Sequence, residues 1–353
     1  MARPELDILN LCRSISMITL TMCVFTSPFV DAVESIETKI QQNVDKGMAY
    51  SSLFPGLADL CDVSQPLRDM SKRKRRDNSR SESKEKVNRN KRRQQLKATK
   101  VFNNLYYVGA DNVSSWAIDT GESIVLVDAL NNNRQAQRYI IDGLKSLGLQ
   151  DKPISHLIIT HGHGDHYGGQ SLIDSTYSPI VIMSEKEWNW LSKGGDGFSS
   201  PNWGERPTRD KGTVHGENIT VGNTTITFLD TPGHTPGTLS ILFPVVDAMN
   251  VKHTAVLWGG TGLNYGPNAA RILSYVESTN RMKRIVKEND IDVFLSNHPK
   301  RDNSYEKLIN LDLSEQNPFI IGSDNVMKIF SMLNHCTYAQ YLKATTLSKK
   351  SPN

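Results

Sequence analysis

Residues 160–169 read THGHGDHYGG and place four potential ligands of a divalent metal within six positions: His161, His163, Asp165 and His166. The run before them, ISHLIIT at residues 154–160, is short, apolar and β-branched, which predicts a buried strand. The four side chains therefore follow the C-terminal end of a strand, where open α/β sheets keep their ligand sites. Gly162 and Gly164 allow the loop to turn tightly. Because neutral imidazole and carboxylate groups suit zinc, this stretch predicts a metal centre.

Two later stretches offer further imidazole ligands. Residues 230–237 (DTPGHTPG) hold His234 in a loop that two Pro-Gly pairs tighten. Residues 291–295 form an apolar run that reads as a strand, and the Ser-Asn-His-Pro sequence after it contains His298. Five of the nine histidines and Asp165 are thus candidate metal ligands at the ends of predicted strands.

This set of three loops resembles the metallo-β-lactamase superfamily, over about residues 100–345. The segment NLYYVGADNVSSWAIDTGESIVLVDA (104–129) is similar to the opening hairpins of subclass 3 of the zinc β-lactamases, and DTPGHTPGTLS (230–240) to their second metal loop. The resemblance implies an α/β fold, an αββα sandwich, with two zinc ions per chain in a cleft at one edge. It implies that one zinc is held by His161, His163 and His234, and the other by Asp165, His166 and His298.

A missing ligand favours this subgroup. Many superfamily members use an Asp or Cys after the strand that follows the second metal loop. The corresponding residues 256–262 (VLWGGTG) hold neither. Subclass 3 also lacks that ligand, whereas the glyoxalase II-like thioesterases and the phosphodiesterase branches keep a bridging aspartate.

The resemblance also implies a reaction. Two zinc ions sharing a water lower its pKa, which makes a metal-bound hydroxide available as the nucleophile. Asp165 is the expected catalytic residue, orienting that hydroxide toward a small-molecule substrate. This chemistry suits the opening of a lactam ring, as in a β-lactamase. A lactonase or a xenobiotic γ-lactam hydrolase are alternatives, because a fold does not name its substrate.

Side chains beyond the ligands are assigned from their place relative to predicted strands. Thr261, Asn264 and Tyr265 follow the strand that faces the site and are candidate substrate contacts. Asp128 ends a strand aimed at the same edge and is a candidate to orient a ligand imidazole. A Gly-, Pro- and Ser-rich stretch at 194–210 predicts a mobile loop bordering the cleft, and His215 after it is a weaker candidate there. The remaining histidines are expected in the core or at the surface: His156, His253 and His335.

The basic charge of the chain lies in one segment. Residues 71–100 hold 14 Lys and Arg against 3 Asp and Glu, while the rest of the chain holds 27 against 34. The segment has few apolar residues, so burial cannot offset its ordering entropy, and we expect a disordered insertion. No aromatic residue interleaves the charges, so base stacking is not expected. We therefore expect no nucleic-acid partner, although a nucleic-acid-directed metallohydrolase with this segment as its arm is an alternative.

The N-terminus predicts export. Residues 1–32 resemble a signal peptide, with Arg3 and Arg13 before an apolar run at 15–30 and small residues at 30–32. The run is shorter than the roughly 20 apolar residues of a membrane span, so we expect secretion without stable membrane association. Residues 33–70 would then form an N-terminal arm on a body of residues 101–345. The sequence does not indicate an oligomeric state.

Cysteines and sequons agree with export. Cys61 and Cys336 are the cysteines outside the expected signal peptide, and an oxidising compartment favours their pairing as a disulfide. Acceptor sequons for N-glycosylation begin at Asn112, Asn218 and Asn223, as expected for a secreted glycoprotein.

Overall fold

The computed structural model describes residues 34–72 and 95–350, so the expected signal peptide and most of the basic segment lie outside the described residues. The strands of the first sheet lie side by side in chain order. Pairing is antiparallel from β1 to β4 and parallel from β4 to β7. These strands are β1 (Thr99–Phe102), β2 (Leu105–Tyr107), β3 (Trp116–Asp119), β4 (Ile124–Val127), β5 (Ile154–Ile158), β6 (Ile180–Ser184) and β7 (Lys211–Thr213).

The second sheet has the order β12-β11-β10-β9-β8. Its pairs are antiparallel except that β11 and β12 are parallel, and the long helix α8 (Ala269–Asn289) connects those two strands. A parallel pair needs such a crossover. The strands are β8 (Asn218–Val221), β9 (Thr224–Asp230), β10 (Leu239–Val246), β11 (Lys252–Trp258) and β12 (Ile291–Ser296).

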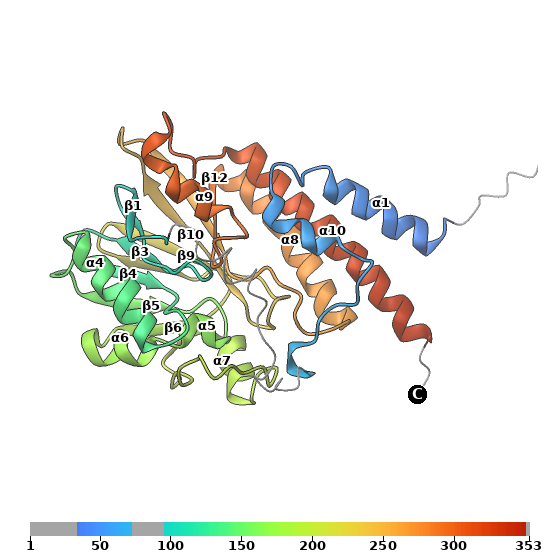
Figure 1. Ribbon diagram of the computed structural model, residues 1–353, viewed down its shortest axis with the longest axis horizontal. Coiled ribbons are helices and arrows are strands. Elements are labelled where there is room, and N and C mark those ends of the chain that lie inside the picture. Colours follow the sequence, from blue (N-terminus) through green and yellow to red (C-terminus); the bar gives the residue numbers. More distant parts are fainter. Residues whose placement is uncertain (1–33, 73–94, 351–353) are drawn as a thin grey trace, which may run out of the picture. The chain divides into compact units, whose positions relative to one another are not determined.

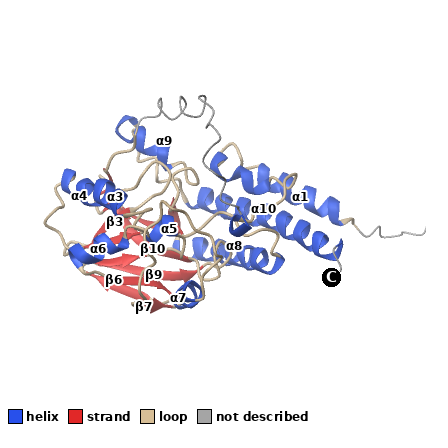
Figure 2. Cartoon of the chain, turned by 60° about the horizontal axis from the view of Figure 1, so that its bottom comes forward, coloured by secondary structure: helices blue, strands red, loops and turns tan. Residues whose placement is uncertain are grey.

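The two sheets face each other across a shared apolar core. Alternate residues of β4 point to opposite faces. Val125 and Val127 pack with side chains of the second sheet, whereas Ile124 and Leu126 pack beneath the helices that cover the first sheet. The outer face of the second sheet packs against α8 and α10 (Ser323–Lys350). Figure 2 shows the strands between these helical layers. This layer order is the αββα sandwich expected from the sequence.

Residues 133–146 form α3 (Asn133–Gln135), a π-helical stretch (Ala136–Ile141) and α4 (Asp142–Ser146) in succession. None of the helices in the described part of the chain combines the length and apolarity that a membrane span requires. The others are α1 (Ile36–Met48), α5 (Gly164–Tyr167), α6 (Gln170–Tyr177), α7 (Glu185–Ser192) and α9 (Ser304–Ile309), with 3₁₀ turns at Pro55–Cys61, Met70–Lys72 and Leu311–Leu313.

The N-terminal arm packs on the closing helix. Helix α1 lies along α10, as Figure 1 shows. The expected disulfide is present between Cys61, at the end of a 3₁₀ turn, and Cys336 on α10. Gln340, one turn further along α10, donates hydrogen bonds from Nε2 to the carbonyl oxygens of Leu60 and Asp62, at 3.1 and 2.9 Å. The arm is thus fixed to the body by a covalent bond and by backbone-directed hydrogen bonds.

The structure differs from the expected disordered segment at both of its ends. Ser71 and Lys72 belong to a 3₁₀ turn, and β1 begins at Thr99. Leu96 is buried, and its backbone N–H donates to Asp111 Oδ1 at 2.9 Å. This leucine is one of the few apolar residues of the segment, and its burial in the inter-sheet core explains why order begins there. The expectation of disorder for residues 73–94 falls outside the described residues.

Gly47 on α1 provides a test of this packing. A Cβ atom at this position would lie 2.6 Å from Cys336 Sγ and 2.7 Å from Cys61 Sγ. Because the bonded sulfurs cannot move aside, we expect Gly47→Ala to lower the free energy of unfolding by about 1–3 kcal/mol, despite the higher helix propensity of alanine. Urea unfolding of Gly47→Ala measures the loss, with the exposed Lys39→Ala on the same helix as the control. Equal or greater stability of Gly47→Ala would contradict the described packing.

Candidate metal centre

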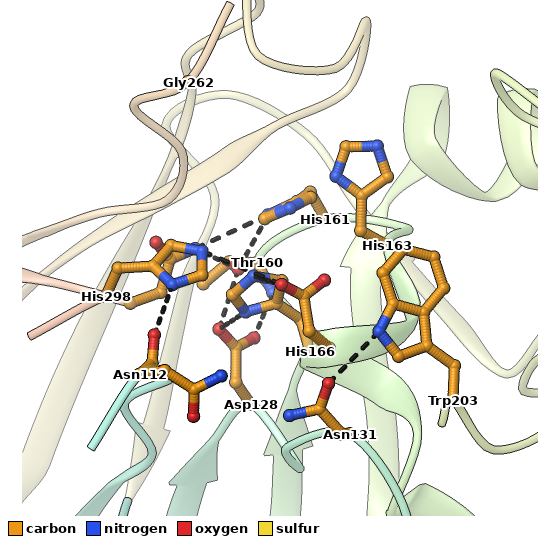
Figure 3. Close-up of polar contacts among 12 residues, drawn as sticks. Asn112, Asp128, Asn131, Thr160, His161, His163, His166, Trp203, Gly262 and His298 are labelled. Atoms are coloured by element: carbon orange, nitrogen blue, oxygen red, sulfur yellow. Dashed lines mark hydrogen bonds and ion pairs between the residues drawn. The ribbon is translucent and has the colours of Figure 1, made fainter. Parts of the chain in front are cut away.

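Three loops at strand ends bring the six candidate ligands together. The first loop follows β5 and runs into α5, the second follows β9, and the third follows β12. His161, His163 and His234 form one group, and Asp165, His166 and His298 form another, with the ligand atoms of each group within 4.8 Å of one another. Figure 3 shows the four loop histidines His161, His163, His166 and His298 around a common space.

Nitrogen atoms of the first group face one another. His234 Nε2 lies 3.1 Å from His161 Nε2 and 3.2 Å from His163 Nδ1. In the second group, Asp165 Oδ2 lies 3.7 Å from His166 Nε2 and 3.9 Å from His298 Nε2. His166 Nε2 is buried and has no hydrogen-bond partner within the described residues. A cation between such atoms would satisfy them, so the donor set fits metal ions.

Hydrogen bonds from the outer ring nitrogens determine which tautomer the ligand histidines adopt. The Nδ1–H groups of four histidines can each donate to a protein oxygen: His161 to the carbonyl of Gly259 at 2.9 Å, His234 to Gly262 at 2.6 Å, His298 to Asn112 at 2.7 Å and His166 to Asp128 Oδ2 at 2.7 Å. With the proton held on the outer nitrogen, the lone pair of the inner nitrogen points into the group. Metal-binding histidines are oriented in this way.

Burial keeps most of these imidazoles neutral. Burial and the neighbouring histidines lower the pKa of His161 and His234 well below the usual value. Burial likewise lowers the pKa of His298, to about 4. Burial lowers the pKa of His166 too, but the carboxylates of Asp165 and Asp128 outweigh it and raise that pKa above its usual value. Neutral imidazole is the form that binds a metal.

Asp128 occupies the position expected from the sequence. It is buried in the left-handed region at φ 61°, which Asp and Asn tolerate better than most residues. Its Oδ1 accepts from the backbone N–H of Thr160 at 2.8 Å, and Oδ2 accepts from Thr160 Oγ1 at 2.9 Å as well as from His166. Figure 3 shows this carboxylate between the two residues. Asp128 thus holds the first metal loop and the ring of His166 in one arrangement.

Glu187 on α7 was not predicted from the sequence. Its carboxylate is fully buried and accepts from the backbone N–H groups of Gly162, at 2.6 Å, and Gly237, at 2.9 Å, and from Thr235 Oγ1 at 2.8 Å. It therefore joins the first metal loop to the second. The sequence Ser184-Glu-Lys-Glu187 has the form of a capping box, which indicates only a local role at the helix start.

The loop at 194–210 borders the site, as expected. Phe198 and Trp203 from this loop and Trp190 from α7 surround the ring of His163, with centroid distances of 5.6, 6.4 and 6.1 Å. Asp196 Oδ2 lies 3.7 Å from His163 Nε2, the outward nitrogen of this ring. Trp203 Nε1 donates to Asn131 Oδ1 at 3.1 Å, a contact drawn in Figure 3.

Arg271 on α8 fixes Asp196. Its Nη1 and Nη2 donate to Asp196 Oδ1 and Oδ2 at 2.7 and 3.1 Å, and its Nε donates to the carbonyl of Gly233 at 3.2 Å. Nη2 also donates to the carbonyl of His234. This pair was not predicted, because Asp196 lies in a Gly-rich loop and Arg271 in a helix 75 residues later.

A cavity of about 110 Å³ opens beside His163. Asn264 and Tyr265, two of the expected substrate contacts, line it, but Thr261 does not. Thr261 is 1% exposed and does not line this cavity, so its contact with substrate stays a prediction. The cavity is lined by Asp69, Met70, Ser71, His163, Asp196, Phe198, Asn264, Tyr265, Asn268 and Arg271.

The other histidines lie away from the ligand groups. His215 is exposed and does not line the cavity. His253 lies between Asp247 and Asp292, at 3.5 and 2.5 Å. His156 Nδ1 lies 2.9 Å from Ser155 Oγ, and His335 Nδ1 donates to Asn43 Oδ1 at 3.0 Å. These three contacts agree with the structural roles expected for those histidines.

Residues 108–248 match the sequence model of the metallo-beta-lactamase superfamily, and this range contains five of the six candidate ligands. This part of the chain is therefore similar to the metallo-β-lactamase superfamily. Solved structures extend the likeness beyond the matched range. The subclass B3 metallo-β-lactamase BJP-1 of Bradyrhizobium japonicum superposes with a TM-score of 0.60 at 23% identity, covering 72% of this chain and 95% of that chain. FEZ-1 of Legionella gormanii superposes with a TM-score of 0.57 at 22% identity, covering 73% and 96%. The chain therefore has the metallo-β-lactamase fold.

Curated relatives match shorter stretches of this metallo-β-lactamase-fold chain. Protein YobT of Bacillus subtilis is 28% identical over 137 residues, 37% of this chain and 56% of that protein. A lactamase-like protein of Pestalotiopsis microspora is 24% identical over 177 residues, 50% and 46% of the two chains. A metal-dependent hydrolase of Brucella anthropi is 29% identical over 104 residues, 29% and 41%. The chain thus spans about half the length of the curated relatives it matches.

Asp128→Asn tests the orientation of His166. Asparagine tolerates the left-handed backbone, so the fold is retained, but its amide cannot replace both carboxylate oxygens as acceptors. We expect the affinity for one of two zinc ions to fall by about 10- to 100-fold. Zinc titration in competition with a chromophoric chelator measures this, with the exposed Asp151→Asn as the control. Unchanged affinity of both sites would rule out this role for Asp128.

Glu187 predicts a pH dependence of stability. Burial raises its pKa from the usual 4.5 to about 7. The folded state therefore binds this proton more tightly than the unfolded state, so the contribution of Glu187 to stability is fully present below pH 4.5 and is lost as the pH rises through 7. The shift is equivalent to about 3 kcal/mol over that range.

We expect Glu187→Gln to remove this slope. The measurement is the free energy of urea unfolding of metal-free protein between pH 5 and pH 7, compared with wild type. Glu122→Gln, at an exposed position in the turn before β4, serves as the control and should follow the wild-type curve. Parallel curves for wild type and Glu187→Gln would show that the buried carboxyl does not titrate in this range.

Proposed function

We propose that this chain is a metal-dependent hydrolase that opens a cyclic amide or ester, a lactam or a lactone. The observation that carries the proposal is the arrangement of the five imidazoles. Four of them have an outer nitrogen held by a protein acceptor, and the inner nitrogens converge. Relatives support the class of reaction, since one of them is named a metal-dependent hydrolase and another a lactamase-like protein.

The two groups of side chains would hold two metal ions, for which zinc is the best match. The first would bind to His161, His163 and His234, and the second to Asp165, His166 and His298. When bound, such ions supply Lewis acidity and a nucleophile at neutral pH. The residues of the chain then determine what reacts and in what orientation.

Asp165 is the expected catalytic residue. Burial raises its pKa, but His166 and His298 outweigh burial and keep the carboxyl ionised, with a pKa below the usual value. An ionised carboxylate accepts hydrogen bonds only. Asp165 can therefore orient the attacking oxygen by accepting a hydrogen bond from it. The aromatic rings of Phe198 and Trp203 exclude water from one side of the same space.

The surroundings favour a small substrate over a nucleic acid. The cavity beside His163 is small, and two of its lining residues, Asp69 and Asp196, are acidic. Its one arginine, Arg271, is paired with Asp196. Phosphodiester backbones require unpaired cations to neutralise their charge. This lining instead suits the substituent of a lactam or lactone whose carbonyl reacts at the ligand groups.

Removing one ligand tests the proposal. We expect His163→Ala to lose metal, as measured by mass spectrometry of the metal content, and to lose at least about 10²-fold in hydrolytic rate. The matched control is His215→Ala, an exposed histidine outside the site. Substrates would be a chromogenic cephalosporin, a γ-lactam, γ-lactones and a thioester, each with and without chelator. Hydrolysis that survives both chelation and His163→Ala would refute a metal-dependent mechanism.

A further inference from the structure

The end of the N-terminal arm forms part of the cavity beside His163. Asp69 pairs with Tyr265 in an isolated antiparallel bridge. The backbone N–H of Met70 donates to the carbonyl of Asn264 at 2.8 Å, and that of Gly266 donates to the carbonyl of Arg68 at 2.9 Å. Three consecutive residues, Asp69–Ser71, therefore line a cavity that is also lined by the candidate metal ligand His163.

The charges in this cavity are not balanced. The guanidinium of Arg271 is held by both oxygens of Asp196 and by the carbonyls of Gly233 and His234, so it is already neutralised. The carboxylate of Asp69 then carries the remaining charge of the cavity lining. Its partner Lys72 lies 3.1 Å away. Because the side chain of Lys72 is 83% exposed, water screens this ion pair and the attraction between the two charges is weak. Among the described residues, the lining therefore carries one surplus negative charge.

The uncharged lining also suits a cation. Phe198 and Tyr265 line the cavity together with two carboxylates, and aromatic rings attract ammonium groups. Arg271 already uses this attraction, since its guanidinium carbon lies 3.9 Å from the centre of the Tyr265 ring. The hydroxyl of Tyr265 is buried and has no hydrogen-bond partner within the described residues. A ligand with polar atoms would satisfy it.

We propose that Asp69–Ser71 is a specificity-determining wall of the substrate cavity, and that the cavity takes an ammonium-bearing substituent of the lactam or lactone. This inference rests on the proposed function. A carboxylate-bearing substituent would be disfavoured, because it would meet Asp69 without an unpaired cation to receive it. Substrate choice would then be made jointly by the arm and by the loop at 194–210, which supplies Asp196 and Phe198.

The arm contains its own matched control. Asp69 Oδ1 accepts from both the N–H and the hydroxyl of Ser71, at 3.1 and 2.5 Å. Asp62 Oδ1 makes the same two contacts with Ser64, at 2.9 and 2.5 Å, but Asp62 does not line this cavity. Asp69→Asn and Asp62→Asn therefore change the same kind of turn, and only one of them changes the charge of the cavity.

The test uses γ-lactones that carry a trimethylammonium, hydroxyl or carboxylate group on the same two-carbon chain. For the zinc-loaded full chain we expect kcat/KM to decrease in that order. Asp69→Asn should raise KM for the ammonium compound by roughly threefold to tenfold and leave kcat unchanged. Asp69→Lys should shift the preference toward the carboxylate, and Asp62→Asn should behave as wild type. A preference for the carboxylate in wild type, or equal effects of Asp69→Asn and Asp62→Asn, would overturn the inference.

A binding measurement separates this inference from the proposed function. A trimethylammonium-bearing cyclopentane of the same shape has no carbonyl to react, and calorimetry measures its binding to wild type and to Asp69→Asn. If no lactam or lactone is hydrolysed but this analogue binds in an Asp69-dependent way, the proposed reaction fails and the cavity assignment stands. If the analogue binds both proteins equally, the cavity assignment fails whatever the enzyme hydrolyses.

Discussion

Converging nitrogen lone pairs are the constraint on which this structure depends. His234 Nε2 lies 3.1 Å from His161 Nε2 and 3.2 Å from His163 Nδ1. Lone pairs this close would repel if nothing lay between them, and all three side chains are buried. Four of the five imidazoles are held by hydrogen bonds from their outer sides. The acceptors are the carboxylate of Asp128, which follows β4, and carbonyl oxygens in the loops before β3 and after β11. The two sheets must therefore pack correctly before the site exists, which makes the inter-sheet core a condition of the chemistry.

The ligand set could be read from the sequence because its signals are local. A strand, a glycine turn and closely spaced histidines occur together at 154–169, and each later histidine follows its own strand. The αββα layers could be expected from the same resemblance. Two residues that join separate elements were not predicted. Glu187 reads as a helix cap, and Asp196 reads as a loop residue, because the partners of both lie on other elements.

The predicted substrate contacts show how far prediction from the sequence can go. Thr261 and Tyr265 lie four residues apart in one loop, yet the first is enclosed by protein and the second lines the cavity. No periodicity applies in an irregular loop, so sequence alone could not distinguish them. Asp69 was assigned to the arm without any role at the site, since nothing local indicates that the arm returns to the cleft.

The candidate metal ligands and part of the cavity wall come from different stretches of the chain. All six candidate ligands lie after residue 160, while part of the cavity wall comes from residues before 73 and is anchored by Cys61 to the closing helix. Reactivity and selectivity are thus encoded in segments that can change independently. Related proteins could retain one reaction while new substrates are accommodated by altering only a short N-terminal stretch, and an inhibitor that contacts Asp69 would distinguish this chain from relatives that share only the metal loops.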